Sequence, residues 1–247
     1  MFALSRRPLA AIVLVLAVPL LSACVSPGTD LARQKIATAE ECLVGKCRFN
    51  NAPLELEPET IRIEGRSYDF NRLAKPLEFV DGTGTDWVAP ETTLTDGASI
   101  PQLFVPLIGF PREPVFANAA ALHDAYCGIG NEDGAVYHAK TWQEVHRLFY
   151  DALVASGTSP LKSKIMFAAV WLGGPRWHED GRTDSTLAAV PASLKQAAML
   201  KARAYVQDKN PDFPTLVDFL IVLEQEMLDK TKALPSSNPN NDLTAGI

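Results

Sequence analysis

The spacing of apolar residues divides the chain into a strand-like part and a helical part. Between Phe49 and Pro101, short apolar runs are separated by turn residues. The stretch "TIRIEG" alternates apolar and polar side chains, "LEFV" precedes the turn-rich "DGTGTD", and "WVAP" and "TTL" follow. A period of two residues is typical of strands. We therefore expect a small antiparallel sheet of three to five strands, which ends at the turn "TDGASIP".

Beyond Pro101 the apolar positions recur with helical spacing. A capping box, "TWQE", predicts a helix start at Thr141, and Ser159 followed by Pro160 predicts another. Five helices are expected, at about residues 115–127, 141–155, 159–173, 192–207 and 215–232. The expected fold class is therefore α+β, with a small N-terminal antiparallel β-sheet followed by a bundle of about five helices in a single domain, residues 49–234.

The first residues resemble the signal peptide of a bacterial lipoprotein. Arg6 and Arg7 precede an apolar run, Leu9–Leu21, which at 13 residues is shorter than the roughly 20 that cross a bilayer. The run ends in Leu-Ser-Ala-Cys, so cleavage would leave Cys24 as the lipidated N-terminus. The position after Cys24 holds Val25 and not an aspartate, which resembles the pattern of lipoproteins that are sent to the outer membrane. The alternative is an ordinary secretory signal that happens to contain a cysteine.

Lipidation of Cys24 would place the protein in the cell envelope, lipid-anchored and facing the periplasm. The other boundaries follow: 1–23 is the signal peptide, 24–48 a linker with a short helix, and 235–247 a polar, disordered tail. Removal of 1–23 leaves 224 residues and changes the net charge from −6 to −8, because this segment holds two arginines and no acidic residue. With this charge and no basic run, we expect the membrane as a partner and no nucleic acid.

Three further cysteines fit an oxidising compartment. Cys42 and Cys47 enclose "LVGK", where Gly45 permits a tight loop, and a local disulfide between them is expected. Cys127 is then a free buried thiol, or it is the true partner of one of the other two cysteines.

The stretch "AALHDAYC" places His123 and Asp124 side by side on the first expected helix. On a regular helix their side chains diverge by about 100°, and His123 shares its face with Cys127, four residues later. An imidazole is suited to act as a base near neutral pH, and a carboxylate to hold a cation or another helix. His146 lies on the aromatic, buried face of the next helix. Only 13 residues join the two helices, so we expect the side chains of His123 and His146 to lie close together. Asp96 is expected to complete this group of polar side chains.

These residues support two hypotheses. In the first, Asp96, His123, Asp124 and His146 bind a divalent metal ion, zinc or calcium. His123, Asp124 and His146 are then the catalytic groups of a metal-assisted envelope hydrolase. In the second, the lipoprotein is non-enzymatic and the same side chains only fix helix packing, so that His146 bonds a backbone carbonyl and Asp96 caps its own turn. The sequence leaves both open, and the substrate or protein partner unknown.

Two loops hold further polar side chains that we expect to face water: Asn131, Glu132 and Asp133 in "GIGNEDG", and Arg176, His178, Glu179 and Arg182 in "PRWHEDGR". The first loop resembles half of a calcium loop but lacks the D-x-[DN]-x-[DN]-G spacing. The second is a secondary site candidate. The chain has no G-x-S-x-G, P-loop, H-E-x-x-H or C-x-x-C motif, so it offers no support for a serine hydrolase, a nucleotide hydrolase or a zincin.

Four strings in order, "TDGASIP", "AALHDAYC", "HRLFYDAL" and "AVWLGGPRW", resemble the domain-of-unknown-function family 1353, found in bacterial and phage genomes. The similarity covers about Leu77 to Trp177. The resemblance implies no activity, because none is established for the family. In the family's pattern the second helix often has "ADRLFYEAL", so His146 stands where an aspartate is common. Both residue types serve as metal ligands or as partners of a base.

A second resemblance, on two short motifs, is to secreted phospholipase A2. There, two antiparallel helices carry a histidine base, a neighbouring aspartate that binds Ca²⁺, and an aspartate that orients the imidazole. The resemblance implies the first two functions for His123 and Asp124. The chain departs from that pattern, because His146 replaces the orienting aspartate, Tyr126 and Cys127 are in swapped order, and the glycine-rich calcium loop is missing.

Overall fold

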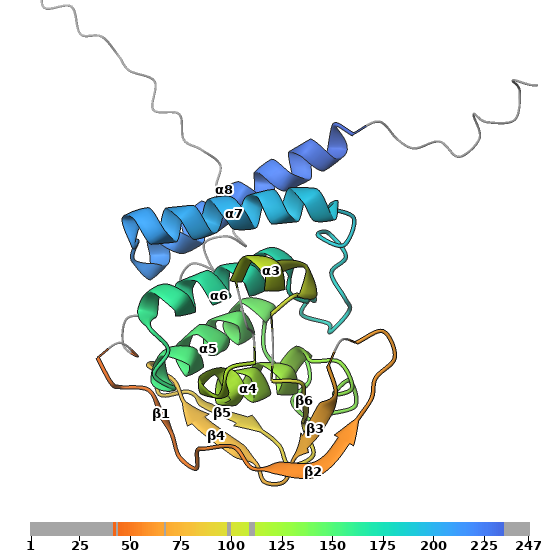
Figure 1. The fold of residues 1–247 in the computed structure, drawn as a ribbon, viewed down its shortest axis with the longest axis vertical. Coiled ribbons are helices and arrows are strands. Elements are labelled where there is room, and N and C mark those ends of the chain that lie inside the picture. The colour runs from red at the N-terminus through yellow and green to blue at the C-terminus, as the bar shows by residue number, and fades with distance from the viewer. Residues whose placement is uncertain (1–41, 43, 67, 98–99, 109–111, 235–247) are drawn as a thin grey trace, which may run out of the picture.

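The computed structural model describes residues 42, 44–66, 68–97, 100–108 and 112–234 (Figure 1). The expected signal peptide, the lipidation site Cys24, the short helix before Cys42 and the tail 235–247 lie outside these ranges. None of the helices within them combines the length and the apolar character that a membrane span requires.

The N-terminal half of the described chain forms two antiparallel sheets of three strands each. The strands are β1 (Arg48–Phe49), β2 (Leu56–Ile61), β3 (Phe70–Leu73), β4 (Leu77–Val80), β5 (Asp86–Ala89) and β6 (Leu94–Thr95). They pair in the orders β1-β4-β5 and β2-β3-β6. The antiparallel strand region is confirmed, but the expectation of one sheet with at most five strands was wrong. Strand β1 is too short to show a period, and the buried residues of β3, Phe70 and Leu73, do not alternate.

The helical half also follows the sequence closely. The helices are α3 (Val105–Ile108), α4 (Ala117–Cys127), α5 (Trp142–Ala155), α6 (Pro160–Gly173), α7 (Ala192–Lys209) and α8 (Phe213–Lys232). Thr141 and Glu144 form the expected capping box of α5, and Ser159 caps α6. Helix α8 begins two residues earlier than expected, because the side chain of Asp212 accepts a hydrogen bond from the Thr215 backbone N–H. The α+β class is confirmed.

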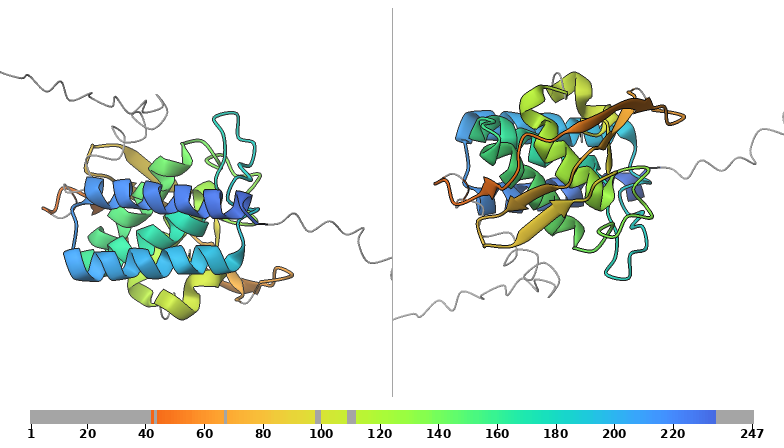
Figure 2. Two further views of the ribbon diagram at one scale, coloured as in Figure 1. Left: turned by 90° about the horizontal axis from the view of Figure 1, so that it is seen from above. Right: turned by 90° about the horizontal axis from the view of Figure 1, so that it is seen from below.

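The elements are stacked in layers, with α4 between the sheets and the other helices (Figure 1). Helix α4 packs on β5 and β6 on one side and on α5 on the other, and α6 then separates α5 from α7. Helices α7 and α8 lie side by side as an antiparallel pair across the far side (Figure 2). Ala119, Ala120 and Ala121 of α4 are fully buried, and their small side chains allow α4 and α5 to approach closely.

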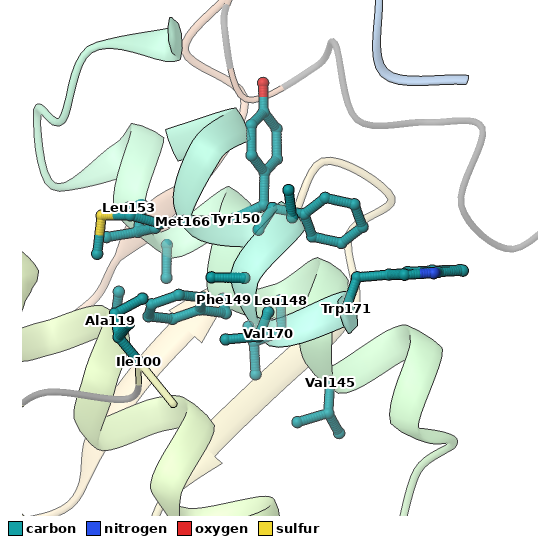
Figure 3. Close-up of a cluster of buried hydrophobic side chains, with 14 of the residues drawn as sticks. Ile100, Ala119, Val145, Leu148, Phe149, Tyr150, Leu153, Met166, Val170 and Trp171 are labelled. Atoms are coloured by element: carbon teal, nitrogen blue, oxygen red, sulfur yellow. The ribbon is translucent and has the colours of Figure 1, made fainter. Parts of the chain in front are cut away.

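The interface of α5 and α6 is the centre of the apolar core (Figure 3). Phe149 of α5 and Met166 and Val170 of α6 have no exposed surface. Complete burial of such side chains contributes about 1.5–3 kcal/mol each. The core therefore holds α5 rigidly, and with it the histidine in its second turn.

Two polar side chains that were expected to face water are buried instead. Arg176 is 5% exposed; its guanidinium donates to both carboxylate oxygens of Glu224, at 2.7 and 2.8 Å, and lies 4.1 Å from the ring centroid of Trp142. Asn131 is 8% exposed and exchanges two hydrogen bonds with the backbone of Leu94, each 2.8 Å long. Both were predicted wrongly because their partners are far away in the sequence. Other residues of the two loops are exposed as expected: Glu132, Asp133, His178, Glu179 and Arg182.

The described cysteines divide into a pair and a single thiol. Cys42 and Cys47 form a disulfide. Cys127 is free and buried at the end of α4, which decides between the two alternatives left by the sequence.

Candidate metal centre

Helices α4 and α5 bring three metal-ligating side chains together. The ring centroids of His123 and His146 are 5.3 Å apart. Cys127 follows His123 by one helical turn, and its Sγ lies 3.5 Å from Nε2 and 3.7 Å from Nδ1 of that imidazole. One ligand atom from each of the three residues lies within 4.8 Å of the others. We call His123, Cys127 and His146 the ligand cluster.

His146 is the most unusual member of the cluster, because neither of its ring nitrogens has a hydrogen-bond partner although the residue is fully buried. The ring is surrounded by Trp142, His123 and the backbone of Gly174. The backbone of Pro175 lies near enough to raise the pKa of the imidazole, yet it makes no hydrogen bond of good geometry. A buried polar group without a partner costs roughly 1–3 kcal/mol.

Burial keeps both imidazoles neutral. It lowers the pKa of His123 to about 3. The pKa of His146 is also well below its ordinary value, first through burial and then through repulsion from His123, when that ring is protonated, and from Arg176. Burial and the charge of Asp124 raise the pKa of the Cys127 thiol. Neutral imidazoles carry the lone pair that a metal ion needs, whereas the thiol must lose its proton to become a ligand.

The two expected carboxylate ligands lie beside the cluster and are not part of it. Oδ2 of Asp124 accepts a hydrogen bond of 2.6 Å from the Thr95 hydroxyl, and its backbone carbonyl accepts one from Asn131. Asp124 therefore fastens α4 to β6. Asp96, half-buried, follows Thr95. Neither carboxylate belongs to the group that could hold a metal ion, which consists of the two histidines and Cys127.

A cleft of about 480 Å³ opens beside the cluster. His123, Asp124 and Cys127 line it, and His146 is not among the lining residues, so it lies behind the other two ligands. The remaining charged residues of the lining are Asp96, Arg66 and Lys195. The apolar part of the lining includes Phe70, Ile100, Leu103 and Ile129. The volume is within the usual range for sites that bind small molecules.

The meeting of His123 with His146 could be predicted from sequence, but the participation of Cys127 was missed. The signal was present, because a histidine and a cysteine four residues apart share one face of a helix. The cysteine count predicts only a free thiol or a disulfide partner at Cys127, and neither expectation points to a metal ligand. The four-residue spacing combined with a second histidine on the facing helix was the pattern to recognise.

Part of the chain has known relatives. Residues 71–170 match DUF1353. This family is described as a protein of unknown function. The match confirms the resemblance for the first three strings and ends at the second residue of the fourth, Val170. The DUF1353 segment contains all of α4 and α5, and hence the whole ligand cluster, whereas α7 and α8 lie outside it.

Two curated relatives from Sinorhizobium fredii are themselves uncharacterised. The protein y4iH is 44% identical over 105 residues, which cover 42% of this chain and 41% of the relative. The protein y4jT is 34% identical over 119 residues, which cover 48% of this chain and 33% of the relative. The chain thus spans less than half the length of either relative. No solved structure matches the chain.

Proposed function

We propose that the chain is a metal-dependent hydrolase of the bacterial cell envelope, with a zinc ion held by His123, Cys127 and His146. The observation that carries the proposal is the buried imidazole of His146, which faces His123 but has no hydrogen-bond partner for either nitrogen. A metal ion bound between the three side chains would satisfy this imidazole and remove the cost of its burial.

The donor set favours zinc over calcium. Calcium takes oxygen ligands, whereas imidazole nitrogen and thiolate sulfur are typical zinc ligands. Ligand atoms around a tetrahedral zinc ion are about 3.5 Å apart, so the three side chains, whose ligand atoms lie within 4.8 Å of one another, would move closer together when zinc binds. Three protein ligands and one open position are typical of catalytic zinc sites. Here the open position would face the cleft that His123 and Cys127 line.

The proposed reaction is the hydrolysis of an ester or amide. Zinc would lower the pKa of a bound water molecule to about 7. Asp96, which lines the same cleft, would take a proton from this water, and the hydroxide would add to the carbonyl carbon. The C–O or C–N bond would then break as Asp96 returns the proton to the leaving group. Asp124 would act as a positioning residue, since its hydrogen bond to Thr95 fixes the helix that carries two ligands.

The experiment is an esterase assay with p-nitrophenyl butyrate on the mature chain carrying Cys24→Ala. Activity should disappear on chelation and return with added zinc. Asp96→Asn should reduce kcat by roughly a hundredfold or more while zinc stays bound. Asp133→Asn, which changes an exposed carboxylate, should leave the rate unchanged. Activity that survives chelation or Asp96→Asn would contradict the proposal.

The envelope location is supported by the signal-like N-terminus and by the disulfide between Cys42 and Cys47, since disulfides persist in oxidising compartments. We propose that Cys24 carries the lipid that attaches the chain to the membrane. Labelling of bacteria with an alkyne-modified palmitate should mark the wild-type chain and not Cys24→Ala. Equal labelling of both would contradict the anchor.

A second candidate function is a non-enzymatic one, in which the cluster only fixes helix packing. The observation that favours it is burial: His123 is 3% exposed, Cys127 5% and His146 0%. Closely packed polar groups can specify one arrangement of helices. In that case the wild-type chain binds no metal and hydrolyses no ester, and chelation does not change its stability.

A further inference from the structure

We propose that the cleft takes an anionic substrate, and that Lys195 and Arg66 bind its phosphate or carboxylate group. This inference rests on the proposed function and names the substrate class of the same site. Two cations from distant parts of the sequence line the cleft: Lys195 from the first turn of α7 and Arg66 from the connection between β2 and β3.

Lys195 is a partly desolvated cation. It is half-buried, and burial lowers the pKa of its ammonium group, followed by the repulsive charge of Arg176. Within the described ranges of the chain, no carboxylate forms an ion pair with it, whereas Lys201, six residues further along α7, pairs with Glu226 at 2.7 Å. An anion in the cleft would replace the water that Lys195 has lost and offset the repulsion from Arg176.

Arg66 presents the second charge from the sheet side of the cleft. It is half-buried, and no ion pair joins its guanidinium to another of the residues that the structure describes. A guanidinium can bind a phosphate or carboxylate through two parallel hydrogen bonds. Arg66 and Lys195 therefore offer an oxyanion two different kinds of donor from different elements of the fold.

The two acidic residues that line the cleft do not cancel its preference for an anionic substrate. Asp124 is only 7% exposed and bonds the Thr95 hydroxyl, and Asp96 is the group we assign to the reacting water. A zinc ion with one thiolate ligand would add one positive charge to the floor of the cleft as long as its bound water keeps both protons. An anionic group on the substrate would thus be attracted by both the floor and the cationic side chains.

The apolar residues that line the cleft further restrict the class of substrate that it can bind. Phe70, Ile100, Leu103 and Ile129 share the cleft with the charged residues. A volume of about 480 Å³ is that of a site for a small molecule or for one end of a longer chain. The substrate class is therefore a small ester or amide that carries an apolar group and one phosphate or carboxylate.

The binding test uses inorganic phosphate and succinate as separate probes in calorimetric titrations of the zinc-loaded mature chain. Lys195→Gln and Arg66→Gln should each weaken binding by roughly ten- to a hundredfold. Lys201→Gln, on the same helix but outside the cleft lining, should bind as the wild type does. Binding of phosphate alone identifies a phosphate group, and binding of succinate alone identifies a carboxylate. If neither probe binds, or if Lys195→Gln binds both normally, the inference is overturned.

A kinetic test separates this inference from the proposed function. Neutral p-nitrophenyl butyrate and anionic mono-p-nitrophenyl succinate offer the same leaving group. We expect Lys195→Gln to lower kcat/KM for the anionic ester by about tenfold more than it lowers kcat/KM for the neutral ester. Equal effects on both esters would overturn the anion-binding inference and leave the proposed hydrolase function intact. Probe binding that depends on Lys195, without hydrolysis of either ester, would overturn the hydrolase and retain the anion site.

Discussion

The Sγ atom of Cys127 lies 3.5 Å from Nε2 of His123, one helical turn earlier in α4. Both side chains are almost completely buried, and they line the same cleft. Their neighbour on α5, His146, has no hydrogen-bond partner for its ring. Burial of the His146 ring without a hydrogen-bond partner costs free energy, and a metal ion bound by the three side chains would remove this cost.

The metal-free protein should lose stability in acid because of the two buried histidines. The folded-state pKa of His123 is lowered to about 3, and that of His146 is also lowered, whereas an unfolded histidine has a pKa of 6.5. The unfolded state therefore binds more protons below pH 6.5, and stability falls as the pH decreases from 6.5. Each histidine should contribute about 1.4 kcal/mol per pH unit in this range.

Urea unfolding of the chelator-treated protein between pH 4 and pH 7 measures this slope. His146→Gln should reduce the slope by about half, because one of the two buried imidazoles is removed. The matched variant His178→Gln changes an exposed histidine and should leave the slope as it is. A slope that His146→Gln does not alter would show that this histidine is already charged in the folded state.

Asp151 should have the opposite effect on stability. Burial raises its pKa from 3.8 to about 7, although the guanidinium of Arg147, 2.8 Å away, lowers it. The folded state therefore binds the extra proton, and the contribution of Asp151 to stability decreases as the pH rises from about 4 to about 7, then levels off. Relative to the wild type, Asp151→Asn should gain stability over this range by an amount on the order of 2–4 kcal/mol. Unfolding at pH 5 and pH 8 checks this, and a constant difference between the two proteins would refute it.

The ion pair between Arg176 and Glu224 should stabilise the packing of α8. It joins the segment after α6 to the middle of α8 through two hydrogen bonds. Glu224→Gln would leave a buried guanidinium without its counter-ion, and a loss of about 3 kcal/mol is expected. Glu226→Gln removes only exposed ion pairs, with Lys201 and Lys230, and should cost much less. Thermal unfolding compares the two, and equal losses would contradict the prediction.

Gly174→Ala should disturb the ligand cluster directly. A Cβ at position 174 would clash with the backbone carbonyl oxygen of Val170 and lie 3.1 Å from Cε1 of His146, whereas one at position 173 would clash with the ring of Phe104, 2.6 Å from its Cε2. Both substitutions should destabilise the fold by about 1–3 kcal/mol through overpacking. Only Gly174→Ala should also weaken zinc binding, by about tenfold or more in a chelator competition. The same zinc affinity for both variants would mean that His146 does not bind the metal.

Much of the fold could be predicted because its signals are local. The capping box at Thr141, the proline at 160 and the helical spacing of apolar residues define their helices within one turn. The two-sheet arrangement could not be predicted in this way, because the pairing of β6 with β3 joins segments more than twenty residues apart. For the same reason the buried positions of Arg176 and Asn131 were missed.

The site was predicted only in part. The approach of His123 to His146 was expected because a short connection joins the two helices that carry them. In the structure the centroids of the two rings are 5.3 Å apart. The expected ligand functions of Asp96 and Asp124 depended on the direction in which each side chain points, which sequence spacing does not determine. Asp124 instead bonds Thr95 across the helix–sheet interface. Cys127, which was not among the expected ligands, belongs instead to the group of three side chains that could hold a metal ion.

The measurement that decides most directly whether this is a metal centre is the zinc content of the folded mature chain, determined by elemental analysis. One zinc ion per chain is predicted, and it should be lost in His146→Gln and in Cys127→Ser while circular dichroism shows both variants folded. Substitution of cobalt for zinc should give a thiolate-to-cobalt absorption band that is absent in Cys127→Ser. A wild-type chain that is folded, that contains no metal and that binds none when zinc is added would contradict the metal centre and the hydrolase built on it.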